Sequence, residues 1–218
     1  MEKIDHIQLI DDLKQIYAKL IPKMSLRQKF VTIYRPLYAP VKEILQFLDP
    51  HSSVLEVGCG TGPILQLINK HCKIRHGLGI DIDRRAIDLA KNVNSYENLQ
   101  FEARNLYDID KKALRSFNLF LCFDILHHIP KKEKMVFLNY LTDSMKKKDR
   151  LILKDLDEKP FYKSFANRIT DFISSRSFVS YEHADTLVAF FEKKGLKVLA
   201  IIRPEKWIWS HYVIVVQK

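Results

Sequence analysis

Hydrophobic and polar residues follow two different rhythms along the chain, and the change comes near residue 53. Before it, apolar residues recur at helical spacing, as Ile7, Ile10 and Leu13 do. After it, short apolar runs alternate with helical patterns. The runs indicate strands at 53–57, 77–81, 98–102, 117–122 and 149–154, and the patterns indicate helices near 62–72, 84–93, 108–115 and 131–145. Such alternation predicts an α/β fold with a parallel sheet and helices on both faces.

The first fifty residues predict helices rather than strands. An apolar stripe through residues 4–21 ends at Pro22, Ser25 and Gln28 form a capping-box pattern, and a short helix follows Pro40. A stripe of this kind is typical of core packing, and contact with a membrane or a partner helix is the alternative.

The last forty residues depart from the alternating pattern. They predict a helix over about 181–194, capped by Gly195, and strands near 196–203 and 209–217. Because these two strands follow one another closely, we expect an antiparallel hairpin.

A glycine-rich turn follows the first predicted strand. Gly58, Gly60 and Gly62 are three of the chain's six glycines, and Pro63 stands where a helix would begin. Glycine admits positive φ and lets a ligand approach the backbone, and a helix N-terminus offers amides to an acidic group. The spacing is G-x-G-x-G, whereas the dinucleotide fingerprint would place its third glycine at Pro63.

Two acidic residues stand in register with this turn. Asp81 ends an apolar run 19 residues after Gly62, where a carboxylate can accept both hydroxyls of a ribose. Glu56 lies inside the strand before the turn. The structural alternatives are that Glu56 only ties down the loop through backbone hydrogen bonds and that Asp81 only caps the next helix.

These motifs resemble class I S-adenosylmethionine (SAM)-dependent methyltransferases over about residues 40–155. V-L-E-V-G-C-G-T-G resembles their first motif, G-L-G-I-D-I-D their second-strand motif, and F-D-I-L-H-H-I-P the segment after their fourth strand. The resemblance implies a doubly wound, seven-stranded, mostly parallel sheet with a reversed C-terminal strand, plus N-terminal helices. We expect one methyltransferase domain over 1–218: a helical cap over 1–50, a cofactor-binding core over 51–155, an acceptor lid over 156–181, and a C-terminal helix and hairpin over 182–218.

The resemblance also implies SAM as the cofactor and assigns roles by position. The turn from Gly58 to Gly62 would face the methionine part, with Glu56 as its support. Asp81 would bind the ribose, Ile82 would pack on the adenine, and Asn105 stands where the family often has an aspartate. The expected cofactor-binding residues are Glu56, Gly58, Cys59, Gly60, Gly62, Asp81, Ile82, Asn105, Leu106, Phe123 and Arg35.

Candidate catalytic residues follow the fourth and fifth predicted strands, because ligands in open α/β sheets bind beyond the carboxyl ends of strands. Asp124, His127 and His128 follow one strand and Asp155 the other. Either histidine is a candidate base, since histidine titrates near neutral pH. The alternative is that one histidine packs, the other is solvated, and Asp155 orders a loop. We expect no metal, because the histidines have no matching cysteine or acid at ligand spacing.

The acceptor is less constrained than the cofactor. Six aromatic residues within 161–181 predict either a lid over an apolar or aromatic acceptor, or an amphipathic helix that covers the sheet. A small molecule, aromatic or acyl, is our first hypothesis. Methylation of RNA or protein is the second, and a non-catalytic cofactor-binding protein is the third.

Composition limits the partners and the compartment that we expect for the protein. The net charge of +10 comes mainly from lysine, which favours a solvated surface over nucleic-acid recognition, although it leaves nucleic acid open. Three cysteines without a C-x-x-C pattern favour a reducing cytoplasm. No apolar run reaches the roughly 18 residues of a membrane span, so membrane contact would be peripheral. The sequence does not predict the oligomeric state.

Overall fold

The computed structural model describes residues 5–37, 39–157, 180–203 and 211–218. The chain forms two compact units, Met1–Asp108 and Ile109–Lys218. The single-domain organisation therefore stays a prediction. Among the described residues, no helix combines the length and the apolar character that crossing a bilayer requires.

Three parallel strands form the centre of the first unit, in the order β3-β2-β1. They are β1 (Ser53–Val57), β2 (His76–Asp81) and β3 (Leu99–Ala103). Every residue of β1 is buried, as expected for a parallel strand that is covered on both faces. Because the three strands run the same way, their carboxyl ends meet at one edge, which carries the glycine turn and Asp81.

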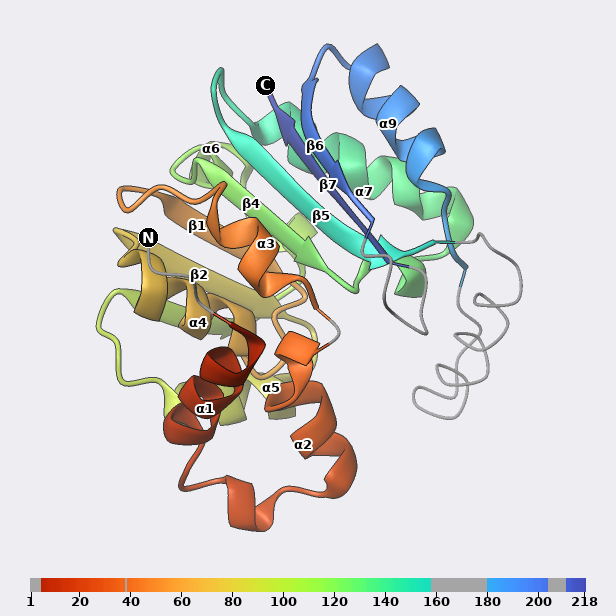
Figure 1. The fold of residues 1–218 in the computed structure, drawn as a ribbon. Helices are drawn as coiled ribbons and strands as arrows, with labels where there is room; N and C mark the ends of the chain where they lie inside the picture. Colours follow the sequence, from red (N-terminus) through yellow and green to blue (C-terminus); the bar gives the residue numbers. More distant parts are fainter. Residues whose placement is uncertain (1–4, 38, 158–179, 204–210) are drawn as a thin grey trace. The chain divides into compact units, whose positions relative to one another are not determined.

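Helices surround these strands, and polar caps start most of them. Asp5 caps α1 (His6–Ile16), Ser25 and Gln28 form the predicted capping box of α2 (Leu26–Thr32), and Asp83 caps α5 (Arg84–Val93). The remaining helices are α3 (Val41–Leu45), α4 (Pro63–Cys72) and the short 3-10 turns η1 (Ile21–Lys23), η2 (Arg35–Leu37) and η3 (Leu106–Asp108). Helices α1 and α3 pack against α4, and α5 packs against β2 and β3 (Figure 1).

The first helix ends earlier than the sequence predicts. We expected it to continue to Pro22, but α1 ends at Ile16 and Pro22 lies inside η1. The backbone leaves the helix at Tyr17, whose side chain is fully buried and donates a hydrogen bond to the carbonyl of Thr61. A tertiary contact thus determines this helix end. Within the stripe, Ile10, Leu13 and Tyr17 are buried, as core packing requires, whereas Ile7 is 68% exposed.

Four strands form the sheet of the second unit, in the order β4-β5-β7-β6. Strands β4 (Leu119–Phe123) and β5 (Arg150–Leu156) are parallel, whereas β7 (His211–Gln217) is antiparallel to both β5 and β6 (Lys197–Ile202). The predicted hairpin and the reversed final strand are confirmed. The helices of this unit are α6 (Lys111–Leu114), the 3-10 turn η4 (Leu126–His128), α7 (Lys131–Ser144) and α9 (Ala184–Lys193), and α9 packs against β6 and β7 (Figure 1).

The predicted elements agree well with the described ones. All seven strands are present, with ends within two residues of the prediction. The predicted helix over 108–115 is only partly right, because its first residues belong to η3 and the helix begins at Lys111 after the cap Asp110. Most of the expected acceptor lid, residues 158–179, lies outside the described residues.

Candidate functional site

The glycine turn of the first unit has the backbone geometry that the sequence predicts. Gly58, Gly60 and Gly62 have φ values of 74°, 54° and 81°, which side chains disfavour. A Cβ on Gly62 would lie 2.5 Å from a ring carbon of Phe101, whereas a Cβ on Gly60 would meet nothing within 4 Å. Gly62 is therefore needed for packing, and the space beside Gly60 is open to a ligand.

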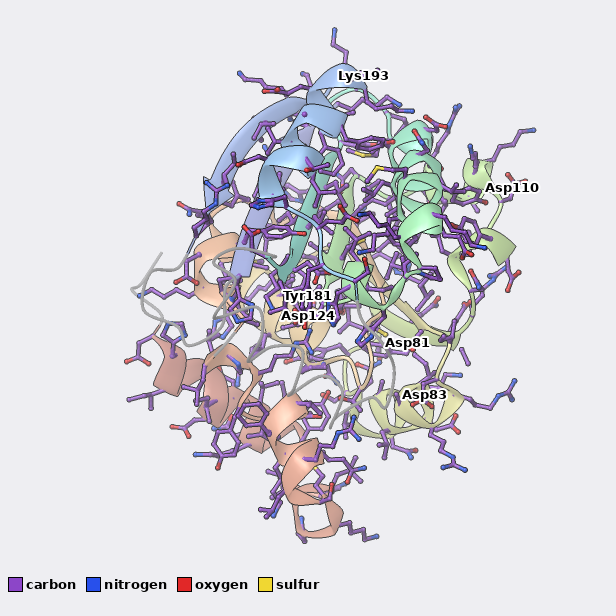
Figure 2. The ribbon with its side chains drawn as sticks, turned by 90° about the vertical axis from the view of Figure 1, so that its right-hand side faces the viewer. Asp81, Asp83, Asp110, Asp124, Tyr181 and Lys193 are labelled. Carbon is purple, nitrogen blue, oxygen red and sulfur yellow. The ribbon has the colours of Figure 1, made fainter. Side chains whose placement is uncertain are left out.

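Asp81 joins this turn to the end of β2. Its Oδ2 accepts a hydrogen bond from the Gly60 amide at 2.8 Å, and its Oδ1 accepts one from the Asp83 amide at 2.9 Å. Asp81 and Asp83 are labelled in Figure 2. Asp83, not Asp81, is the N-cap of α5, so the alternative in which Asp81 only caps that helix is wrong. A carboxylate offers about four acceptor positions, so each oxygen of Asp81 can still accept a ligand hydroxyl.

Glu56 is a buried carboxyl group directly beneath the turn. The amide of Leu65, in the first turn of α4, hydrogen-bonds this carboxyl group. Burial raises the pKa of Glu56 to about 8, although the charge of Arg35 acts in the opposite direction. Its Oε2 has no hydrogen-bond partner among the described residues. Glu56 is thus a neutral group at pH 7 that supports the loop and keeps one oxygen for a further partner.

Two residues of the N-terminal segment, Tyr17 directly after α1 and Thr32 of α2, also contact the glycine turn. Tyr17 Oη donates to the Thr61 carbonyl at 2.6 Å, and the hydroxyl oxygens of Thr32 and Thr61 lie 3.1 Å apart. Sequence reasoning missed both residues. The only local sign was a tyrosine at the end of an apolar stripe, which is usually a packing residue.

The other expected cofactor residues differ in exposure. Ile82 is 79% exposed, which leaves its side chain open to a ligand. Asn105 is exposed, and its Oδ1 accepts a hydrogen bond from the Tyr107 amide at 3.1 Å. Leu106 is buried, and so is Phe123, which belongs to β4 of the second unit.

A buried histidine–carboxylate pair lies at the carboxyl end of β5 in the second unit. His127 Nδ1 and Asp155 Oδ1 are 2.5 Å apart, and the His127 amide donates to Asp155 Oδ2 at 3.2 Å. Burial raises the pKa of Asp155, but the charge and hydrogen bond of His127 outweigh burial and the net pKa is lowered. The structure thus brings together two of the four candidate catalytic residues. His128 is exposed, with its ring centroid 4.1 Å from that of His127.

Asp124, another candidate, lies beside the same pair. The Lys154 ammonium, which is fully buried, hydrogen-bonds Asp124 Oδ1, and the Asp124 amide donates to the Lys154 carbonyl at 2.9 Å. One ligand atom from each of Asp124, His127 and Asp155 falls within 4.8 Å of the others. The expectation that the histidines lack acids at ligand spacing is therefore wrong, because the chain crossover brings β5 beside η4.

Several residues around this cluster were missed by sequence reasoning. His211 and Tyr212 reach it from β7, opposite Leu156 and Asp155. Burial and, next, the charge of Lys154 lower the pKa of His211 to about 3, so this ring is neutral at physiological pH. Lys134 of α7 is fully buried, and its ammonium donates to the Ser180 carbonyl. Figure 2 labels Asp124 and Tyr181 in this unit.

Comparison with known proteins identifies the family. A family model described as "Methyltransferase domain" matches residues 48–189, well over half of the chain. The chain belongs to this methyltransferase family. The resemblance inferred from the motifs is thereby confirmed.

Individual relatives of this methyltransferase match shorter regions. The ubiquinone biosynthesis O-methyltransferase of Coxiella burnetii (strain Dugway 5J108-111) is 32% identical over 85 residues, which cover 38% of this chain and 35% of that protein. The ribosomal protein L11 methyltransferase of Clostridium botulinum (strain Eklund 17B / Type B) is 35% identical over 77 residues, which cover 34% of this chain and 24% of that protein. The matched regions span about a third or less of these relatives.

Solved structures extend the likeness to the whole fold. The crystal structure of magnesium protoporphyrin IX methyltransferase from Synechocystis PCC 6803 with bound SAH has a TM-score of 0.68 and 17% identity, covering 95% of this chain and 93% of that chain. The predicted fold class is confirmed.

The residues of the first unit of this methyltransferase fit a sulfonium nucleoside. The space beside Gly60 can accommodate a ligand next to the backbone. Asp81 can accept further hydrogen bonds from ribose hydroxyls. Glu56 Oε2 is a buried polar atom with no hydrogen-bond partner among the described residues. These are three independent features within one turn and the adjoining strand ends.

Proposed function

We propose that this methyltransferase uses SAM to methylate a small molecule, aromatic or acyl, at an ionisable hydroxyl group. The observation that carries the proposal is the buried pair of His127 and Asp155, with 2.5 Å between Nδ1 and Oδ1. A dedicated base is needed when the nucleophile carries a proton of high pKa, as a hydroxyl does. The family alone does not demand such a base.

The first unit holds the cofactor in this proposal. When bound, SAM supplies an electrophilic methyl group on a sulfonium centre. Asp81 accepts the ribose hydroxyls while the Gly60 and Asp83 amides fix its orientation. Ile82 offers an apolar surface to the adenine, and Glu56 supports the turn through the Leu65 amide.

In this proposal, residues of the second unit remove the proton from the acceptor hydroxyl. Because Asp155 is ionised, it accepts the hydrogen on Nδ1 of His127, which leaves Nε2 as the basic nitrogen. His127 then takes the hydroxyl proton as the acceptor oxygen becomes nucleophilic, and Asp155 stabilises the imidazolium. Lys154 neutralises Asp124, so the cluster gains only one charge in this step. His128 is the second candidate for the base.

The proposal also covers the domain organisation and the compartment. We propose that the chain works as one cytoplasmic domain with its acceptor lid over 156–181. Support for a reducing compartment comes from Cys59, Cys72 and Cys122, none of which forms a disulfide.

The test measures transfer of an isotopically labelled methyl group from SAM to matched acceptors. We expect label in phenols and hydroxy acids and none in their methyl ethers. His127→Gln should lower kcat at pH 7 by about 10²–10⁴-fold with a phenol, which ionises near pH 10. The loss should shrink with a nitrophenol, which ionises near neutral pH and needs no base. His128→Gln is the matched control.

Two results would contradict this assignment. An equal loss of kcat with both acceptors would show that His127 is structural, and a loss found only in His128→Gln would assign the base to His128.

Methylation of protein or RNA is the second candidate function, because the net charge is +10 and one relative is named a ribosomal protein methyltransferase. Turnover that falls steeply with salt would favour it, since phosphate binding releases counterions. A chain that binds SAM but labels no acceptor would be non-catalytic.

A further inference from the structure

The segment between Tyr17 and Val41 combines exposed apolar side chains with a one-sided charge. Leu26 is 86% exposed, and Phe30, Val31, Tyr34 and Leu37 are 39–45% exposed. Large apolar residues exposed singly are ordinary, but five exposed within twelve residues of one segment make that segment a candidate contact surface. We name Leu26, Phe30, Val31, Tyr34 and Leu37 the α2 face.

The stretch of sequence that contains the α2 face carries positive charges only. Between Asp12 and Glu43 the sequence carries seven basic residues and no acidic one. The basic residues are Lys14, Lys19, Lys23, Arg27, Lys29, Arg35 and Lys42. Lys23 and Arg27 are exposed beside Leu26. The combination of exposed apolar and basic side chains suits a surface that is apolar inside and anionic outside.

We infer that the α2 face docks on the surface of an anionic lipid membrane. Aromatic and aliphatic side chains on a basic helix enter the boundary between headgroups and acyl chains, while lysine and arginine attract anionic lipids. A second copy of this chain is a poorer occupant, because two α2 faces would bring like charges together.

A buried residue of the same helix contacts the glycine turn. Thr32 of α2 is buried, and its hydroxyl oxygen lies 3.1 Å from that of Thr61. A helix with its side chains is roughly 10 Å across, so docking would hold the glycine turn about one helix thickness from the headgroups. The inference goes beyond methyl transfer and does not depend on the identity of the acceptor.

The experiment is flotation of the full chain with vesicles of phosphatidylcholine alone or mixed equally with phosphatidylglycerol. We expect binding to the anionic vesicles that is at least tenfold tighter and weakens with salt. The variants L26S/V31S and K23E/R27E should each bind at least tenfold more weakly. V136S and K132E are matched controls on α7, since Val136 is 57% exposed and Lys132 is exposed, and they should bind like the wild type.

Three outcomes would overturn the inference. The first is a wild type that does not bind anionic vesicles. The second is a loss of vesicle binding in the α7 controls equal to that in the α2-face variants. The third is a wild-type dimer that L26S/V31S converts to monomer, with no vesicle binding by either protein. SAM affinity and labelled methyl transfer to a soluble phenol, without vesicles, should be unchanged in L26S/V31S. These readouts separate a failure of docking from a failure of the proposed function.

Discussion

Glu56 and Asp155 are both buried carboxyl groups, one in each unit, and their pKa values shift in opposite directions. Each is 1% exposed. Burial raises the pKa of Glu56 to about 8, although the charge of Arg35 and the hydrogen bond from the Leu65 amide both act to lower it. For Asp155 the bonded His127 outweighs burial and lowers the pKa. The first carboxyl is therefore neutral at pH 7 and the second is charged.

The contrast separates two ways of building a site. In the proposed function, the first unit binds SAM through backbone geometry and hydrogen-bond acceptors, and its buried Glu56 is neutral. The candidate site of the second unit buries charged groups, namely Lys154, which pairs with Asp124, and the ionised Asp155, which pairs with His127. Buried charges of this kind cost desolvation energy, so they favour a role in the reaction over one in stability. Substitutions should accordingly affect binding in the first unit and turnover in the second.

Replacement of Asp155 by asparagine should have the largest effect. An amide cannot stabilise an imidazolium and can bind the wrong tautomer of His127, so we expect kcat to fall by about 10²–10⁴-fold. The dissociation constant for SAM should stay within twofold. Steady-state kinetics and calorimetry on the same protein measure both quantities.

Asp143→Asn is the matched control, because Asp143 is an exposed aspartate of α7 that pairs with a cation, Lys194, outside the candidate site. Unfolding by denaturant should be followed in parallel. A proportional loss of SAM affinity and turnover in Asp155→Asn would contradict the claim that the first unit serves binding and the second serves turnover.

Replacement of Asp81 by alanine should produce the reverse pattern. The ribose hydroxyls lose their acceptor and the Gly60 amide loses its partner, so SAM should bind at least tenfold more weakly, about 1.4 kcal/mol. At saturating SAM we expect kcat to change much less. Calorimetry with Asp88→Ala, an exposed aspartate of α5, provides the comparison. Unchanged affinity in Asp81→Ala would disprove the assignment to the ribose.

The two regions also differ in how far the sequence reveals them. The glycine turn, Glu56 and Asp81 lie on consecutive elements, so local spacing was enough to predict their arrangement. His211 and Tyr212 come from β7 and Lys134 from α7, and only tertiary structure brings their side chains within electrostatic reach of Asp155. Lys154 did give a local sign, because a lysine inside the apolar strand Leu151–Leu156 demands a buried partner. The position of Tyr17 in an apolar stripe indicated only packing, since its hydrogen-bond partner is a backbone carbonyl 44 residues away.

The pKa of Glu56 predicts a specific dependence of stability on pH. The folded state holds this proton up to about pH 8, whereas the unfolded chain releases it near 4.5. Because the folded state binds more protons in that window, the free energy of unfolding falls as pH rises, by about 1 kcal/mol per unit near neutrality. Glu56→Gln cannot ionise, so its stability relative to the wild type should increase from pH 5.5 to 8.

Denaturant unfolding at several pH values measures this difference, and Glu97→Gln, an exposed glutamate, should show no such trend. A constant difference between Glu56→Gln and the wild type across this range would mean that Glu56 is ionised in the folded state. The contrast with Asp155 would then disappear.

The smallest expected effect concerns a metal ion at Asp124, His127 and Asp155. These residues offer suitable ligand atoms, but each is already engaged by a cation or a hydrogen bond. The ammonium of Lys154 binds Asp124, and Nδ1 of His127 binds Asp155. A divalent ion would have to displace a buried lysine and would face its positive charge at close range. We therefore expect dialysis against a chelator to leave kcat within twofold. Lost turnover that a divalent ion restores would show instead that Lys154 moves aside, and the base would then be a metal-bound group rather than His127.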